Sequence, residues 1–213
     1  MPPPILIIDG VTGAGKTSVL TELRGRMPST VEFILEDDTL GDLMEQIRDP
    51  VWRAQPTFAA LDSVLQRLED GIASANGKRF VVERFHLTAF ALFPHWEYYQ
   101  TYDERLVKLG AMIVLLTFPP EIAEARAIQR RDRQNWAKGM DDWYGSRAQA
   151  LDAVLESQQR RRTSLSKTRL PCLHIDTRGQ EWRKYAETII SYWTALNDPS
   201  FRTGLRSIVR YHK

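Results

Sequence analysis

The sequence predicts an α/β fold in which helices flank a parallel five-stranded sheet. Three observations support this prediction. Short apolar runs typical of strands alternate along the chain with longer amphipathic segments typical of helices. One run, Ala111–Phe118, is apolar throughout, as expected for a parallel strand that is covered on both faces. The first run, Ile5–Asp9, leads into a glycine-rich loop that opens a helix, which is the context of a phosphate-binding loop.

Three strands are predicted in the N-terminal half. Helix-forming residues follow the glycine-rich loop over 16–26, and a β-branched run over 31–35 predicts the second strand. Leucine, valine and isoleucine recur at helical spacing over 61–72, so we expect an amphipathic helix there. The third strand is Phe80–Glu83, which runs directly into Arg84.

The C-terminal half continues the alternation. Helical spacing over 99–109 precedes the apolar strand, and Pro119-Pro120-Glu121 is typical of a helix start, with the helix expected to continue to about Arg133. Residues 134–146 are polar and lack a period, which predicts a loop with exposed tryptophans. The remaining elements are a helix over 147–167, a strand over 172–175, a loop over 176–180 and a last helix over 181–196. We expect the strand order 2-3-1-4-5 with right-handed crossovers and a lid at about 130–146.

Length and composition indicate one soluble domain. The 213 residues are 43% hydrophobic and 26% charged, which allows a sizeable core, so we expect a single domain over 1–213. The single cysteine, Cys172, excludes an internal disulfide and fits a reducing compartment. The apolar stretch Ile5–Ile8 is too short for a signal peptide or a membrane span. We therefore expect a cytoplasmic protein that does not bind membranes, and the sequence leaves a homodimer open.

The charge distribution argues against a nucleic-acid partner. The formal net charge is only +2, although basic residues cluster at Arg160–Arg162 and in a C-terminal tail over about 198–213. The simplest interpretation of such clusters is a solvated helix face.

A nine-residue run, GVTGAGKTS, contains the pattern G-x-x-x-x-G-K-[ST]. We expect all nine residues to contact bound phosphates, and they are Gly10, Val11, Thr12, Gly13, Ala14, Gly15, Lys16, Thr17 and Ser18. Glycines allow backbone N–H groups to turn toward an anion, and the helix N-terminus adds positive potential.

In such a loop Lys16 reaches the outer phosphates of ATP and the Thr17 hydroxyl can bind Mg²⁺. A GTPase is a poor alternative. The D-x-x-G match at Asp38–Gly41 follows the second strand too closely to leave room for a switch segment, and no N-K-x-D guanine motif is present.

Beyond the phosphate loop, the chain resembles the thymidylate-kinase and deoxynucleoside-kinase branch of P-loop kinases over residues 5–180. Glu83-Arg84 at the end of the third strand is similar to an acidic-Arg pair of that family. The resemblance implies that Glu83 supports Mg²⁺ and that Arg84 holds a phosphate or the acceptor. Residues 126–133 resemble the arginine-bearing lid, whose cations stabilise the transferred phosphoryl group. Arg126 and Arg130 are four apart, which predicts a shared helix face.

A weaker set resembles the segments that shape the acceptor pocket in deoxynucleoside kinases. Its members are Asp49-Pro50, Trp52, Thr57-Phe58, Trp96 and Tyr99. The sequence departs from the family pattern at Ala59, where the family has a base-reading glutamine, and after the second strand, where Glu-Pro is absent. The loop 176–180 resembles the segment that packs against adenine, although it is also a plain connection.

An acidic cluster follows the second strand. Glu36, Asp37 and Asp38 repel one another, so we expect one of them to have a function. Alternation along the strand predicts that Asp37, and in second place Glu36, accepts a proton from an acceptor hydroxyl. The alternative is a solvated turn in which Asp38 caps the next helix.

The expected function is that of an ATP- and Mg²⁺-dependent kinase whose acceptor is a nucleoside or nucleoside monophosphate. One alternative is a P-loop kinase of another metabolite or antibiotic hydroxyl, because the fold does not fix the acceptor. The other is a nucleotide-dependent regulator or nucleic-acid-associated ATPase, which the basic clusters favour and the near-neutral charge disfavours.

Overall fold

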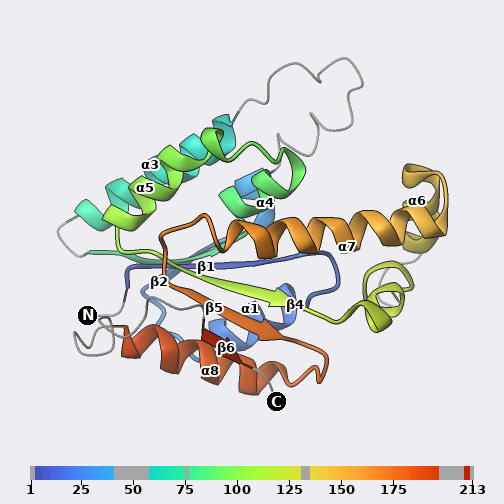
Figure 1. The fold of residues 1–213 in the computed structure, drawn as a ribbon. Coiled ribbons are helices and arrows are strands. Elements are labelled where there is room, and N and C mark those ends of the chain that lie inside the picture. The colour runs from blue at the N-terminus through green and yellow to red at the C-terminus, as the bar shows by residue number, and fades with distance from the viewer. Residues whose placement is uncertain (1–2, 41–57, 75–76, 131–134, 197–208, 212–213) are drawn as a thin grey trace.

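The computed structural model describes residues 3–40, 58–74, 77–130, 135–196 and 209–211. Its strands form one parallel sheet with the order β2-β3-β1-β4-β5-β6 (Figure 1). In that order they are β2 (Val31–Ile34), β3 (Arg79–Glu83), β1 (Ile5–Gly10), β4 (Met112–Thr117), β5 (Cys172–Asp176) and β6 (Val209–Tyr211). The predicted order 2-3-1-4-5 is confirmed. All five predicted strands are present, and a sixth strand that was not predicted, β6, comes from the segment interpreted as a basic tail and extends the sheet beyond β5.

Helices cover both faces of the sheet. They are α1 (Lys16–Arg24), α3 (Ala59–Ala73), α4 (His86–Leu92), α5 (Gln100–Lys108), α6 (Trp136–Tyr144), α7 (Arg147–Ser164) and α8 (Trp182–Ala195). Helices α1 and α8 lie on one face, and α3, α4, α5 and α7 lie on the other (Figure 1). The N-terminal part of α7 projects past the sheet and carries α6. Shorter turns are η1 (Trp96–Tyr98), η2 (Pro120–Ile122) and the π-helical turn η3 (Glu124–Ile128).

The alternation of side chains along β1 divides the core into two layers. Leu6 and Ile8 belong to the cluster that packs against α1 and α8, whereas Ile5 and Ile7 belong to the cluster that packs against α3 and α5. All four side chains are buried. The next residue in the alternation, Asp9, is therefore directed toward the face that α4 and α7 cover, and it too is buried.

Two predicted elements differ in the structure. The helix predicted after Pro119-Pro120 is replaced by η2 and η3, and η3 ends at Ile128, short of Arg133. Residues 136–144, predicted as a loop, form α6. The apolar residues of this segment fall on one helical stripe, with Ala137 and Met140 packed against the core. Two glycines hid this stripe in the sequence, since glycine lowers helix propensity.

Candidate active site

The phosphate loop lies between β1 and α1 and depends on two glycines with positive φ. Gly15 is the N-cap of α1 with φ 90°, and a Cβ at this position would lie 2.3 Å from the ring of Trp182. Gly13 has φ 80°, and a Cβ there would lie 2.3 Å from the backbone oxygen of Arg126. Both the backbone conformation and the close contacts therefore require glycine.

Lys16 begins α1 and is buried beneath the loop. Its Nζ lies 3.5 Å from the backbone oxygen of Val11. Burial and the neighbouring Arg84 lower the pKa of Lys16 to about 7, and the carboxylates of Glu36, Glu83 and Asp9 oppose this shift. A lysine whose ammonium is this poorly compensated is suited to bind an anion, and phosphate oxygens would supply the missing negative charge.

Arg84 follows β3 in a left-handed conformation, with φ 60°. Its backbone N–H donates to the oxygen of Ile8 over 2.9 Å, so the turn is fixed to β1. The side chain is mostly buried, and its Nε lies 2.9 Å from Glu36 Oε2. A positive φ is unfavourable for arginine, and such strain is concentrated at functional sites.

The structure separates the three residues of the acidic cluster. Glu36 is half-buried and pairs with Arg84, whereas Asp37 is exposed. The first choice of Asp37 assumed strand alternation, but β2 ends at Ile34 and residues 36–40 are helical. Asp38 Oδ2 accepts a hydrogen bond of 3.3 Å from the N–H of Leu35, which stabilises this helix start.

Thr39 holds the same helix start against β3. Its hydroxyl lies 3.1 Å from the backbone oxygen of Glu36 and 3.0 Å from that of Glu83, and the residue is buried. This contact brings the acidic cluster to Glu83 and Arg84. This contact was not predicted, because no sequence pattern distinguishes a buried threonine from an exposed one.

A buried ion pair behind the site was also missed. Arg161 of α7 donates through Nε to Asp9 Oδ1 over 2.9 Å and through Nη2 to the hydroxyl of Thr88 over 3.1 Å. The same hydroxyl lies 2.9 Å from each oxygen of Asp9. Burial alone would raise the pKa of Asp9, but Arg161, Arg84 and the hydrogen bond from Thr88 hold it below its usual value.

The basic run Arg160–Arg162 therefore does not form a solvated face. Arg160 donates to the backbone oxygen of Ala91 over 3.0 Å, and Arg162 lies 3.4 Å from the hydroxyl of Thr117. The buried positions of α7 recur at helical spacing, but the stripe changes from apolar to polar toward the C-terminus. Its members are Ala150, Val154, Gln158, Arg161 and Ser164. This helical spacing is the feature of the sequence from which burial of Arg161 could have been predicted.

The two predicted lid arginines do not share a helix face, because η3 ends before Arg130. The guanidinium of Arg126 is directed at the phosphate loop and donates to the backbone oxygen of Gly13 over 2.8 and 3.1 Å. It also donates to the backbone oxygen of Thr177 over 3.1 Å. Arg130 is half-buried just beyond η3. The loop 176–180 thus lies next to the phosphate loop.

The predicted acceptor-pocket residues are only partly described. The segment 49–57 lies outside the described residues. The ring centroids of Phe58 and Tyr99 lie 5.3 Å apart, and those of Trp96 and Phe90 lie 5.7 Å apart. Tyr99 is fully buried, so these described aromatic residues pack α3, α4 and α5 together.

The residues present fit a magnesium ion bound together with a nucleotide. Thr17 is exposed in the first turn of α1, and the carboxylate of Glu83 lies close enough to Lys16 to influence its pKa. Within the described ranges no cluster of three or more His, Cys, Asp or Glu residues could hold an ion unaided. Mg²⁺ suits such a site, since it commonly takes one or two protein ligands and completes its shell with phosphates and water.

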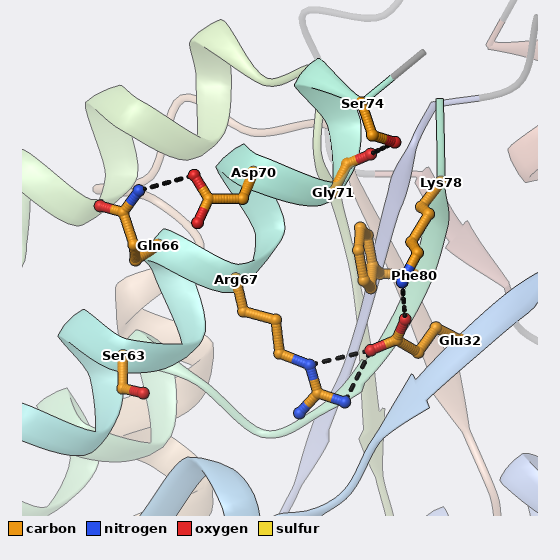
Figure 2. A pocket seen from close by; sticks show the side chains of 9 residues that line it. All are labelled: Glu32, Ser63, Gln66, Arg67, Asp70, Gly71, Ser74, Lys78 and Phe80. Carbon is orange, nitrogen blue, oxygen red and sulfur yellow. Dashed lines mark hydrogen bonds and ion pairs between the residues drawn. The ribbon is translucent and has the colours of Figure 1, made fainter. Parts of the chain in front are cut away.

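A surface pocket of about 580 Å³ lies elsewhere, between α3 and the β2–β3 edge (Figure 2). Its charged groups already have partners: Glu32 binds Arg67 over 2.6 Å and Lys78 over 3.0 Å, and Asp70 accepts a hydrogen bond from Gln66. Phe80 of this pocket is near the amino end of β3, whereas ligands of such sheets bind beyond the carboxyl ends. The pocket is therefore separate from the candidate site.

Comparisons with known proteins agree with this fold. No family model matches the chain, and no curated protein matches it in sequence. Among solved structures, YorR from Bacillus subtilis in complex with phosphorylated GDP is 15% identical with a TM-score of 0.57, over 91% of this chain and 97% of that one. A gluconokinase from Sinorhizobium meliloti is 18% identical with a TM-score of 0.55, over 94% and 97%. Shikimate kinase from Acinetobacter baumannii is 18% identical with a TM-score of 0.52, over 91% and 94%.

These likenesses show that the chain has the fold of P-loop kinases. They do not select the thymidylate-kinase and deoxynucleoside-kinase branch, because the similar structures include kinases of other kinds. Within the part of the chain that the structure describes, no helix combines the length and apolar character needed to span a bilayer.

Proposed function

We propose that the chain is an ATP- and Mg²⁺-dependent kinase that transfers a phosphoryl group to a hydroxyl of a small molecule. The observation that carries this proposal is the convergence of Lys16, Arg84 and Glu36 at the carboxyl ends of β1 and β3. Two cations for phosphate oxygens and a carboxylate lie in one place, beside a phosphate loop with its required glycines.

In this proposal the phosphate loop and Lys16 hold the outer phosphates of ATP. Thr17 and Glu83 would hold Mg²⁺, which neutralises phosphate charge when it is bound. Arg84 stabilises the transferred group. When phosphate oxygens bind Arg84, an ion pair with the phosphate replaces the ion pair between Arg84 and Glu36. Glu36 then becomes available to accept the proton of the acceptor hydroxyl. Arg130 is the remaining candidate for a cation beyond the phosphate loop.

The presence of a half-buried carboxylate favours a hydroxyl acceptor over a phosphate acceptor, since transfer to a phosphate needs no base. Among hydroxyl acceptors a nucleoside is our first choice, from the resemblance of the Glu83-Arg84 pair to that of deoxynucleoside kinases. A nucleoside monophosphate and another metabolite or antibiotic hydroxyl remain the alternatives. A cytoplasmic location and a homodimer stay predictions.

A regulatory or nucleic-acid-associated ATPase is a weaker candidate in this structure. One of the two basic clusters that favoured it, Arg160–Arg162, makes contacts inside the fold. Most of the other, the C-terminal tail, lies outside the described residues. Binding of DNA or RNA that weakens steeply with salt would support it nevertheless.

The test is a screen of nucleosides, nucleoside monophosphates, sugars and other hydroxyl compounds for acceptor-dependent ADP release. The proposal predicts release with at least one hydroxyl acceptor and none without added Mg²⁺. Release at the same rate with and without every acceptor would contradict it, because the protein would then be an ATPase.

A further inference from the structure

The centre of the phosphate loop is held by one residue from two sides. Gly13 packs so closely on η3 that a Cβ would lie 2.3 Å from the backbone oxygen of Arg126 and 2.9 Å from the nitrogen of Ala127. The side chain of Arg126 then folds back onto the same glycine, with Nε at 3.1 Å and Nη2 at 2.8 Å from the oxygen of Gly13. The backbone and the side chain of Arg126 thus both contact Gly13.

The same guanidinium is fixed at its other end. Nη1 donates to the backbone oxygen of Thr177 over 3.1 Å. The group lies 5.7 Å from the ring centroid of Phe118 and 5.4 Å from that of Trp182, within the range of cation–π contacts. Trp182 in turn packs on Gly15. An arginine that binds fixed backbone carbonyls in this way would lose several hydrogen bonds if it moved to a transferring phosphoryl group.

Holding the oxygen of Gly13 fixes more than one atom. This oxygen and the N–H of Ala14 belong to one rigid peptide plane. The N–H of Ala14 donates to the oxygen of Val11 over 3.1 Å, so the plane is bound at both edges. The direction of this plane sets the course of the loop backbone whose N–H groups meet the phosphates.

The turn that carries Arg126 also contacts helix α6. In η3 the N–H of Gln129 donates to the oxygen of Glu124 over 2.9 Å, a π-type bond of the kind that often marks functional positions. The backbone oxygen of Ala127, the residue after Arg126, accepts a hydrogen bond of 2.8 Å from Nε1 of Trp136, the first residue of α6. Arg147 adds a second link between η3 and α6, since it forms ion pairs with Glu124 of η3 and with Asp141 of α6.

We propose that Arg126 is a positioning residue that fixes the phosphate loop through the carbonyl of Gly13, and that η3 links this loop to α6 through Trp136. Arg126 then acts on the nucleotide through the loop and is not one of the cations that contact the transferred group. The inference rests on the proposed function for its activity readout, but its binding and exchange readouts need no acceptor.

The first experiment compares Arg126→Lys, Arg126→Gln and Arg130→Gln by titration with a non-hydrolysable ATP analogue and Mg²⁺. Lysine keeps the charge but cannot donate to both carbonyls, so both Arg126 variants should bind the analogue about ten- to a hundred-fold more weakly, the range of one or two lost charge-assisted hydrogen bonds. With an acceptor in hand, KM for ATP should rise more than kcat falls. Arg130→Gln should show the opposite pattern, with lower kcat and nearly unchanged binding.

Equal binding by wild type and both Arg126 variants would overturn the inference. So would a variant that loses the choice between ATP and GTP analogues, since Arg126 would then contact the base directly.

The second experiment compares Trp136→Phe with Trp143→Phe by hydrogen exchange. Phenylalanine at 136 keeps the aromatic ring but removes the Nε1–H donor, whereas Trp143 is an exposed residue of the same helix. Without nucleotide, Arg126→Gln should speed exchange in residues 10–17 and in α6, and Trp136→Phe should speed exchange in α6. Trp143→Phe should match wild type. If Trp136→Phe also matches wild type, no link to α6 exists.

The two proposals fail differently. If wild type binds the analogue but phosphorylates no acceptor, the kinase proposal fails while the binding and exchange comparisons still test Arg126. If wild type does not bind the analogue, unchanged exchange in Arg126→Gln overturns the positioning role, and faster exchange in residues 10–17 retains it.

Discussion

The two sides of the candidate site are built in different ways. The phosphate side is one continuous run, residues 10–18, between a strand and a helix. The acceptor side is assembled from separate segments, because Glu36 and Arg84 meet only through a tertiary contact. The buried pair of Asp9 and Arg161 lies behind them. A contiguous motif supplies all its residues from one segment, although Arg126 also holds the loop backbone at Gly13. An assembled site depends on every element that carries one of its residues. The acceptor side should therefore be the more sensitive to changes at a distance.

The largest effect expected from this comparison is on stability. Arg161→Ala leaves Asp9 as a buried carboxylate without its ion-pair partner, which should lower the free energy of unfolding by about 3–5 kcal/mol. The double variant Asp9→Asn with Arg161→Met should recover much of the loss. Arg160→Ala is the matched control, since it removes a partly exposed ion pair with Glu156 and a hydrogen bond to Ala91 but leaves no buried carboxylate unpaired. Urea unfolding measures all three, and equal losses for Arg160→Ala and Arg161→Ala would contradict the account.

A smaller effect, on turnover, distinguishes the carboxylates of the acidic cluster. Glu36→Gln should lower kcat by about 10²-fold, the low end of general-base catalysis, with the affinity for ATP nearly unchanged. Asp37→Asn is its control and should stay close to wild type, because Asp37 is exposed. Steady-state kinetics with the identified acceptor decides between them. A loss confined to Asp37→Asn would restore the assignment made from strand alternation.

The smallest effect lies outside the site, at Asp103 of α5. Burial opposes ionisation of Asp103, but the nearby His86 and hydrogen bonds from Thr168 and the N–H of Arg169 hold its pKa below the ordinary 3.8. The stability that the ionised carboxylate contributes is therefore present above pH 3.8 and is lost as the pH falls through the lower folded value. Thr168→Val should cost about 0.5–1.5 kcal/mol at pH 7, and less as the pH drops.

Unfolding curves between pH 7 and pH 2 test this prediction. Turnover of Thr168→Val should equal that of wild type, which separates a contact that only stabilises the fold from those that assemble the site. A pH-independent difference between the two proteins would show that Asp103 is not the cause.

The contiguous parts of the molecule were predicted from the sequence better than the parts assembled from separate segments. The strands and the phosphate loop were predicted because parallel strands are apolar on both faces and because the loop needs glycines at fixed spacing. Helix α6 was missed, since Gly139 and polar neighbours mask its apolar stripe. Strand β6 was missed because its three residues, Val209–Tyr211, are too few to show a periodic pattern and lie in a segment interpreted from its charge.

At the site, the residue types were predicted better than their partners. Glu36 ranked below Asp37 because strand alternation was applied to residues that turned out to be helical. Arg161 was assigned to the surface, because arginine is rarely buried unless it is paired, and its partner Asp9 lies 152 positions away along the chain. Partners at that separation are set by the packing of α7 on the sheet, which no local pattern contains.

Kinase activity itself is tested by following the label of [γ-³²P]ATP into an acceptor. Wild type should transfer the label to a hydroxyl compound in the presence of Mg²⁺, and Lys16→Ala should lower this transfer by about 10²–10³-fold while keeping the fold, because Lys16 serves bound phosphates. Label that appears only as inorganic phosphate, or transfer by Lys16→Ala at the wild-type rate, would contradict a kinase built on this loop.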